Sequence, residues 1–392
     1  MKTTSYSCVL FFAVLPFFAL APLARGASKG AGDYLVYVGT YTENHNGSKG
    51  IYVYRFSTAT GKLTPMGLAG ESANPSFVAI DPSGRYLYAV NELSSFDGKK
   101  GGAVSAFAIN RRTGKLKFLN QVASHGMAPC FVAVDKTGHY VMVANYSSGT
   151  VAVFKVNKNG SLGETTADVQ QTGSSVDPKR QTRPYAHMIN VSPDNRFALS
   201  CDLGTDQVLV YHFDAKHGTL TADDPPYSKV NPGSGPRHFV FSPNGRYVYV
   251  ISEMGSNVTV FSYKPSTGGL HKLQTLSALP ADFKGKESDS AEIAVLPNGK
   301  FVYGSNRGHD SIAVFKVAPG KGMLTPIQWA PVEGKEPRNF TIDPTGHWLI
   351  AANQDSNNIT VFRINDKNGK LTYTGESIDL PAPVCIQFLN VR

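Results

Sequence analysis

The stretch "RHFVFSPNGRYVYVISE", Arg237 to Glu253, decides the fold because it recurs along the chain. Two β-rich runs flank "SPNG", in which Pro has the fixed φ of a tight turn and Asn and Gly tolerate a positive φ. The pattern therefore predicts a strand, a tight turn and a second strand. Five further segments share this pattern, and they begin at Ser76, Cys130, His187, Ala291 and Arg338.

Each predicted hairpin is followed by a second β-rich pair, such as "TVAVFKV" or "NVTVFSY", a "TGKL", "NGSL" or "GGL" turn, and a further strand. Four strands repeating at a period of roughly 50 residues are typical of one β-propeller blade. The six repeats predict six complete blades.

The two ends of the chain supply a seventh blade. The segment that starts "YLVYVGTYTENHNGSKG" at residue 34 lacks a first strand, whereas "APVCIQFLNVR" at 382–392 resembles a first strand alone. Pairing them removes the exposed edge of an open array. We therefore predict an all-β, seven-bladed propeller in which the C-terminal strand pairs with the N-terminal strands. The alternative, two stacked β-domains, leaves both terminal fragments unpaired.

Residues 1–26 have the layout of a secretory signal peptide, and 27–392 form the predicted propeller domain. Lys2 precedes an apolar run from Val9 to Leu20, and small residues follow. The run is shorter than the roughly 20 residues that span a bilayer. We expect an exported protein, periplasmic or secreted, without a membrane span after cleavage; retention of the segment as an anchor is the alternative.

Composition and motifs narrow the possible functions. The net charge of +9 comes from scattered Lys and Arg residues without an aromatic-interleaved basic stripe, so no nucleic-acid partner is expected. Cys130, Cys201 and Cys385 remain after the signal, an odd number that does not imply a disulfide framework. The sequence has no G-x-S-x-G, H-E-x-x-H or Walker motif. No metal or cofactor is predicted, and the oligomeric state stays open.

Repeat symmetry locates a candidate site. The residue that opens the first strand of a blade and the residue that closes its second strand lie at one end of the hairpin, opposite the Pro-Gly turn. Ionisable residues occupy several of these positions, while neighbouring strand positions are apolar in every copy, which favours a functional mouth of the central channel. Ordinary exposed loop ends are the alternative. The opening positions are Ser76, Cys130, His187, Arg237, Ala291, Arg338 and about Val384; the closing positions are Tyr41, Glu92, Tyr146, Leu203, Glu253, Arg307 and Gln354.

These residue types limit the chemistry. Several arginines at one mouth suit a substrate with a carboxylate or phosphate, because a guanidinium group binds either one bidentately. His187 is a candidate general base or acid, and Glu253 could orient it, hold a water or act as the base itself. For His187 the alternative is a buried core histidine.

Four motifs carry a resemblance to a known family: "VANYSSGTVAVF" (143–154), "DLGTDQVLVY" (202–211), "GPRHFVFSPNGRYVYVISE" (235–253) and "SNRGHDSIAVF" (305–315). The chain resembles the seven-bladed β-propeller lactonases, which include bacterial propeller-type 6-phosphogluconolactonases and carboxymuconate-cyclising enzymes, over nearly all of its mature length. The resemblance implies that His187, Arg237, Glu253 and Arg307 are catalytic and that Arg338 helps to bind an anion. In "YAH", Tyr185 stands where the family often has a histidine. The ring positions add Glu92, Tyr146 and Gln354 as substrate-binding candidates.

The resemblance implies hydrolysis of a sugar lactone to an aldonic acid in carbohydrate metabolism, with water attacking the carbonyl of a small, anionic lactone. A lactonase of phosphorylated sugars belongs in the cytoplasm, so an exported relative could instead act on gluconolactone or a carboxylated lactone. The alternatives are an exported binding or scaffold propeller without catalysis and a carboxymuconate-type lactonising isomerase.

Overall fold

The computed structural model describes residues 1–4, 33–43, 47–285 and 287–391 of the chain. Residues 1–4 carry no secondary structure, and the rest of the predicted signal peptide (1–26) lies outside the described residues. The described residues form β-strands only, so none of them belongs to a helix that could cross a membrane.

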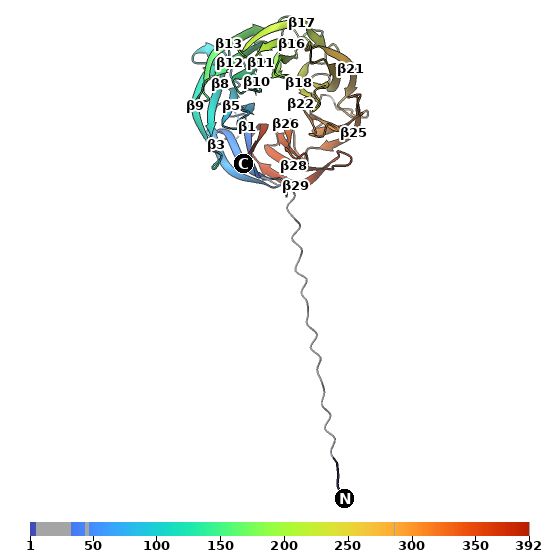
Figure 1. Cartoon of the computed structure of the whole chain (residues 1–392). Coiled ribbons are helices and arrows are strands. Elements are labelled where there is room, and N and C mark those ends of the chain that lie inside the picture. Colours follow the sequence, from blue (N-terminus) through green and yellow to red (C-terminus); the bar gives the residue numbers. More distant parts are fainter. Residues whose placement is uncertain (5–32, 44–46, 286, 392) are drawn as a thin grey trace. The chain divides into compact units, whose positions relative to one another are not determined.

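Seven four-stranded antiparallel sheets are arranged as blades around a central axis (Figure 1). Their first strands, which lie next to one another in ring order, surround the axis. Blades 1 to 3 are β4 (Val78–Ile80), β5 (Tyr86–Asn91), β8 (Ala103–Ile109) and β9 (Leu116–Ala123); β10 (Pro129–Val134), β11 (Tyr140–Asn145), β12 (Thr150–Val156) and β13 (Leu162–Gln170); and β14 (Ala186–Val191), β15 (Phe197–Asp202), β16 (Gln207–Asp214) and β17 (Thr219–Lys229).

Blades 4 to 6 repeat this order, and a two-stranded hairpin is inserted between β5 and β8 of blade 1. The inserted strands are β6 (Ser95–Phe96) and β7 (Lys99–Lys100). Blades 4 to 6 are β18 (Pro236–Phe241), β19 (Tyr247–Ser252), β20 (Asn257–Tyr263) and β21 (Leu270–Ser277); β22 (Asp289–Val295), β23 (Phe301–Arg307), β24 (Ser311–Val317) and β25 (Leu324–Pro331); and β26 (Pro337–Ile342), β27 (Trp348–Asn353), β28 (Asn358–Ile364) and β29 (Leu371–Asp379).

Blade 7 closes the ring from both ends of the chain. Its strands are β30 (Pro383–Asn390), β1 (Asp33–Thr40), β2 (Gly50–Ser57) and β3 (Leu63–Glu71), and β30 pairs antiparallel with β1 from Tyr34↔Asn390 to Thr40↔Pro383. The predicted closure is confirmed, and the alternative of two stacked β-domains is wrong.

One buried aromatic side chain on the third strand of every blade fills the space between neighbouring sheets. Each of these side chains is nearly or fully inaccessible to solvent, and burial of a side chain of this size contributes about 1.5–3 kcal/mol. The seven residues are Tyr54, Phe107, Phe154, Tyr211, Phe261, Phe315 and Phe362.

The inner hairpins are closed by self-capped turns. In blade 2, Asp135 is fully buried, and its Oδ1 accepts hydrogen bonds from the backbone N–H groups of His139 (2.8 Å) and Tyr140 (2.9 Å). Its Oδ2 accepts from the N–H of Thr137 at 3.0 Å. These bonds satisfy donors that the tight turn leaves without a ladder partner. Gly138 follows with φ of 74°, a value that favours glycine.

At the opposite end of the hairpins, the first strands carry β-bulges. In blade 4, Pro236 pairs with Ser252 and His238 with Ile251, so Arg237 is an extra residue without a partner in the ladder. A bulge re-aims the side chain of its extra residue. The same shift leaves out Cys130, His187, Arg338 and Val384 in their blades, and it leaves out Ala291 and Glu292 together in blade 5. The bulges explain why the residues that open the first strands project at the mouth instead of alternating within the sheet.

Candidate functional site

Three arginines from different parts of the chain surround the buried carboxylate of Glu253, which follows β19. Oε2 of Glu253 accepts a hydrogen bond from Nε of Arg237 at 3.0 Å and lies 2.9 Å from Nη2 of Arg307. Oε1 accepts from Nη2 of Arg180 at 2.5 Å. Arg237 is the bulged residue of β18, Arg307 ends β23, and Arg180 lies in the loop before β14. Repeat geometry thus brings Glu253, Arg237 and Arg307 together, as the sequence predicts.

The arginines fix the charge of Glu253. Burial by itself would raise the pKa of this carboxyl, but the positive charges of Arg307 and Arg237 and the hydrogen bond from Arg180 lower it to about 2. Glu253 is therefore a carboxylate at neutral pH, and its strongest interactions hold guanidinium groups in place.

Arg307 has one guanidinium nitrogen without a hydrogen-bond acceptor. Nε donates to the backbone carbonyl of Asp289 at 3.2 Å, and Nη1 lies 3.5 Å from Oε1 of Glu336. Nη2 is close to Glu253 but out of line for a hydrogen bond, and it is buried with no acceptor among the described residues. The charge of Nη2 is thus compensated by Glu253, whereas its hydrogens have no acceptor aligned with them.

His187 lies beside this cluster on the bulge of β14. Its Nε2 is 3.9 Å from Oε2 of Glu253, which is too long for a direct hydrogen bond, and its Nδ1 is 3.7 Å from the Sγ of Cys130. Burial lowers the pKa of His187 well below 6.5, and the positive charge of Arg237 lowers it further. The imidazole is therefore neutral at pH 7 and has a lone pair that can accept a proton.

Tyr146 and Tyr185 form the wall next to His187. Their rings lie 4.9 Å apart, and the ring of Tyr146 meets His187 edge-on at 5.5 Å. Burial raises the pKa of Tyr146, and the nearby Glu253 carboxylate raises it further, so the phenol stays protonated. Tyr185 packs its ring against that of Tyr146.

A second group of predicted residues lies across the mouth around Glu92. Its Oε2 accepts hydrogen bonds from Tyr41 (2.9 Å) and from Ser76 (2.5 Å). Arg338 places its Cζ 5.4 Å from the centre of the Tyr41 ring, a cation–π distance. Arg338 and Arg237 share a small recess with Glu92.

Gln354 is the predicted residue that lies apart from both groups. Its side-chain amide donates to Asp355 at 2.9 Å, and its backbone N–H donates to the carbonyl of Glu336. It follows β27 at the mouth end, as predicted, but its described contacts stay within blade 6 and the loop that leads into it.

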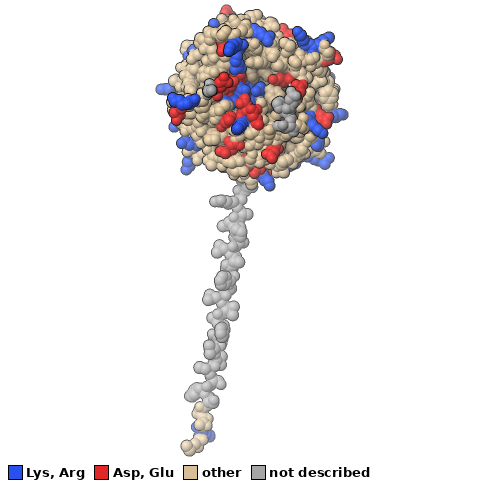
Figure 2. All heavy atoms as spheres, turned by 180° about the vertical axis from the view of Figure 1, so that it is seen from behind, with Lys and Arg blue, Asp and Glu red and all other residues tan. Residues whose placement is uncertain are grey.

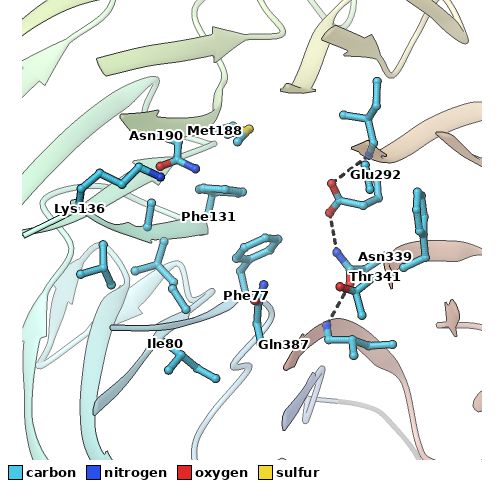
Figure 3. Close-up of a pocket in the computed structure, with 18 residues that line it drawn as sticks. Phe77, Ile80, Phe131, Lys136, Met188, Asn190, Glu292, Asn339, Thr341 and Gln387 are labelled. Atoms are coloured by element: carbon cyan, nitrogen blue, oxygen red, sulfur yellow. Dashed lines mark hydrogen bonds between the residues drawn. The ribbon is translucent and has the colours of Figure 1, made fainter. Parts of the chain in front are cut away.

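Aromatic rings separate the mouth from the rest of the channel. Phe77 and Phe131 pack at 4.3 Å, and His238 lies edge-on to Phe131 at 5.2 Å. Beyond them is a cavity of about 320 Å³ toward the turn end, in which the carboxylate of Glu292 accepts from Asn339 at 2.5 Å (Figure 3). The predicted catalytic residues do not line this cavity, which has Glu292 and Lys136 as its ionisable residues.

Four residues near the mouth were missed by the sequence analysis. Arg180 belongs to a loop with no counterpart in the other repeats, so symmetry could not reveal it. Asp289 and Glu336 each lie two residues before an opening position, and His238 follows one. Knowledge of the bulges, which turn adjacent residues of the first strand toward the mouth, would have identified these three positions.

Acidic and basic side chains lie next to one another around the centre of one face of the propeller (Figure 2).

The family model described as a lactonase with a seven-bladed β-propeller matches residues 35–388. The chain belongs to this family. This lactonase-family enzyme is 37% identical over 357 residues to the 6-phosphogluconolactonase of Bacillus subtilis (strain 168), which covers 91% of this chain and 99% of the relative.

Two further relatives agree. The 6-phosphogluconolactonase of Formosa agariphila is 35% identical over 340 residues, 86% of this chain and 94% of the relative. The solved structure of the periplasmic gluconolactonase of Pseudomonas aeruginosa matches with a TM-score of 0.85 and 33% identity, covering 92% of this chain and 100% of the other. This lactonase-family enzyme is thus 6-phosphogluconolactonase-like over its propeller, and membership of the family implies a small-molecule lactone as substrate.

Proposed function

We propose that the protein hydrolyses a sugar lactone to an aldonic acid at the mouth formed by His187, Arg237, Glu253 and Arg307. The observation that carries this proposal is the buried Nη2 of Arg307, which is ion-paired with Glu253 at 2.9 Å but whose hydrogens have no aligned acceptor among the described residues. A preorganised donor of this kind suits the oxyanion that develops when water adds to a carbonyl carbon. Arg237, held by Glu253 and by the carbonyl of Ala291 at 2.8 Å, places a second positive charge beside it.

In the proposed reaction, His187 is the general base. The oxygen of a water molecule bonds to the lactone carbonyl carbon while the neutral imidazole takes a proton from the water. The oxyanion then re-forms the C=O bond as the bond between that carbon and the ring oxygen breaks, and the ring oxygen takes the proton from the His187 imidazolium to give the hydroxy acid and neutral His187. Glu253 is a poor base because its pKa is about 2. Its role is to hold the arginines and to stabilise the imidazolium that forms.

The other mouth residues are assigned to substrate binding. Arg338, Glu92 and Tyr146 present a cation, an anion and a phenol to a polyhydroxylated ring, and Gln354 is placed at the rim. The relatives named 6-phosphogluconolactonase and periplasmic gluconolactonase support a sugar lactone, with or without a phosphate. Export through the segment 1–26 is part of the proposal, and the substrate panel therefore includes both the unphosphorylated lactone and its 6-phosphate.

The test is a lactone panel on the purified mature protein. Glucono-1,5-lactone and its 6-phosphate are offered to the wild type, to Arg307→Ala and to Arg307→Lys, with acid release and thermal unfolding followed in parallel. We expect Arg307→Ala to lower kcat by at least about 10²-fold, as removal of an oxyanion donor does elsewhere. Wild-type turnover in a folded Arg307→Ala variant contradicts the assignment.

The same assay separates the alternative functions. A folded wild-type protein that hydrolyses none of the lactones is a binding propeller. Loss of the ultraviolet absorbance of a carboxymuconate identifies a lactonising isomerase.

A further inference from the structure

The arginines at the mouth interact with carboxylates of the protein before any substrate binds. An anionic substrate that binds one of these arginines therefore has to compete with one of the protein's own carboxylates. The arginines are Arg180, Arg237, Arg307 and Arg338, and the carboxylates are those of Glu92, Glu253, Asp289 and Glu336.

The ion pairs of the cluster differ in how easily they can be exchanged. The side chains of Arg237 and Glu253 are 3% and 8% exposed, and breaking such a buried pair leaves an uncompensated charge. Arg180 is 38% exposed and its second partner, Asp289, is 41% exposed. Their contact, Nη1 to Oδ2, is 3.5 Å long, as is that between Arg307 and Glu336, but it is the most solvent-exposed of the arginine–carboxylate contacts in the cluster.

We propose that Arg180 binds the phosphate group of a phosphorylated sugar lactone and that Asp289 occupies the place of that phosphate in the free enzyme. Arg180 keeps its bond to Glu253 through Nη2 and turns Nη1, now paired with Asp289, toward the incoming oxyanion. The inference rests on the proposed function, because it places the phosphate relative to a lactone held at Arg307.

The state of Asp289 supports its role as the carboxylate that yields. Burial raises the pKa of Asp289, and the Glu253 carboxylate raises it further. Its negative charge is therefore poorly stabilised, in contrast to that of Glu253. A phosphate ester offers three oxygens to the planar guanidinium group of Arg180 and can be bound by two hydrogen bonds. The carboxylate of Asp289, in contrast, contacts only one nitrogen of Arg180, at 3.5 Å.

The loop that carries Arg180 is anchored as a binding element requires. Oδ1 of Asp177 accepts from the backbone N–H groups of Lys179 and Arg180, both at 2.8 Å. Gln181 is fully buried, and its side-chain amide donates to the carbonyl of Leu203 at 2.9 Å. These bonds hold the chain in place on both sides of Arg180. The hydrogen-bonded turn therefore positions the guanidinium group next to Glu253.

Arg183 in the same loop provides a matched control. Its Cζ lies 5.1 Å from the centre of the Tyr185 ring, and its Nε donates to the Tyr185 hydroxyl at 3.4 Å. Arg183→Gln removes the same charge from the same loop without touching Glu253 or Asp289.

The experiment compares the wild type, Arg180→Gln, Arg180→Lys, Asp289→Asn and Arg183→Gln by two measurements. The first is kcat and KM for glucono-1,5-lactone and for its 6-phosphate. The second is the binding of inorganic phosphate by calorimetry at fixed ionic strength, which does not depend on turnover.

We expect Arg180→Gln to raise KM for the 6-phosphate about 10–100-fold, because a charge-assisted hydrogen-bonded pair with the phosphate is lost. The same variant should change KM for the neutral lactone far less. Arg180→Lys restores part of the difference. Asp289→Asn lowers KM for the 6-phosphate about twofold to fivefold, because a half-exposed competing charge is gone. Arg183→Gln leaves both KM values unchanged.

Two outcomes overturn the inference: Arg180→Gln raises both KM values by the same factor, or Arg180→Gln and Arg183→Gln bind inorganic phosphate as tightly as the wild type. If the wild type hydrolyses neither lactone, the proposed function is wrong. Loss of phosphate binding in Arg180→Gln alone then still supports the phosphate site.

Discussion

The first two strands of a blade run between a tight turn at one end and the mouth of the channel at the other. The two ends differ in how strictly their residues repeat from blade to blade. At the turn end, the six inner hairpins that are continuous in sequence, those of blades 1 to 6, repeat one solution: a tight turn whose polar side chains cap its own backbone, as Asp135 does in blade 2. At the mouth end, equivalent positions hold His187, Arg237 and Arg338 in three blades and Cys130 in a fourth. Repetition at one end secures the hairpins, and departure from repetition at the other end leaves positions available for chemistry.

The largest expected effect comes from removing the charge at the centre of the mouth. Glu253→Gln leaves Arg237 and Arg307 buried without their carboxylate, which in comparable cases costs about 3–5 kcal/mol. We expect the free energy of unfolding, measured by urea denaturation, to fall by about that amount and lactonase activity to be lost. A variant as stable as the wild type would show that the arginines do not depend on Glu253.

The next effect concerns His187 and is chemical. We expect His187→Gln to lower kcat about 10²–10⁴-fold, the usual contribution of a general base, with little change in KM. The base works in its neutral form, and its pKa lies well below 6.5. In the wild type, kcat/KM should therefore stay level as pH falls from 8 to 6.5 and decline only in more acidic solution.

The residual activity of His187→Gln should lack this acid limb. A wild-type midpoint at or above pH 6.5, or an unchanged acid limb in the variant, would assign the base to another group.

Some features of the propeller and its mouth could be predicted from the sequence, and others could not. The fold was predictable because the hairpin, the β-rich pair that follows it and the turns recur, so each copy corroborates the others. Glu253, Arg237 and Arg307 were predictable because they interrupt that repetition. Arg180 was not, because its loop occurs once, and the strength of the coupling between Glu253 and the arginines depends on burial and distance, which no spacing reveals.

A variant at the tight turn of blade 2 tests whether residues at the turn end contribute to stability and not to catalysis. Asp135→Ala removes the acceptor for three backbone N–H groups inside a buried turn. Bonds to a charged acceptor are worth about 1.5–3 kcal/mol each, partly offset by solvent, and we expect a loss of about 1–3 kcal/mol in unfolding free energy with kcat unchanged. Although burial would raise the pKa of Asp135, side-chain hydrogen bonds from Thr137 and Asn195, together with the backbone N–H groups of Thr137 and Tyr140, lower it. The contribution of Asp135 is therefore present above the ordinary carboxyl pKa and is lost as pH falls through the lowered value.

The matched measurement is urea denaturation at neutral and acidic pH. A drop in kcat as large as that of His187→Gln would contradict the division between the two ends.

The smallest effect is expected in the equivalent turn of blade 3, which is capped by different residues. In blade 3 the cap is Ser192, whose hydroxyl accepts from the N–H of Phe197 at 3.1 Å and donates to Asp194 at 2.6 Å. Asp194 also pairs with Nε of Arg196 at 2.8 Å, but its side chain is 35% exposed. Asp194→Ala should therefore cost about 0.2–1 kcal/mol, the range of exposed ion pairs. A loss equal to that of Asp135→Ala would mean that burial of the carboxylate does not set its contribution to turn stability.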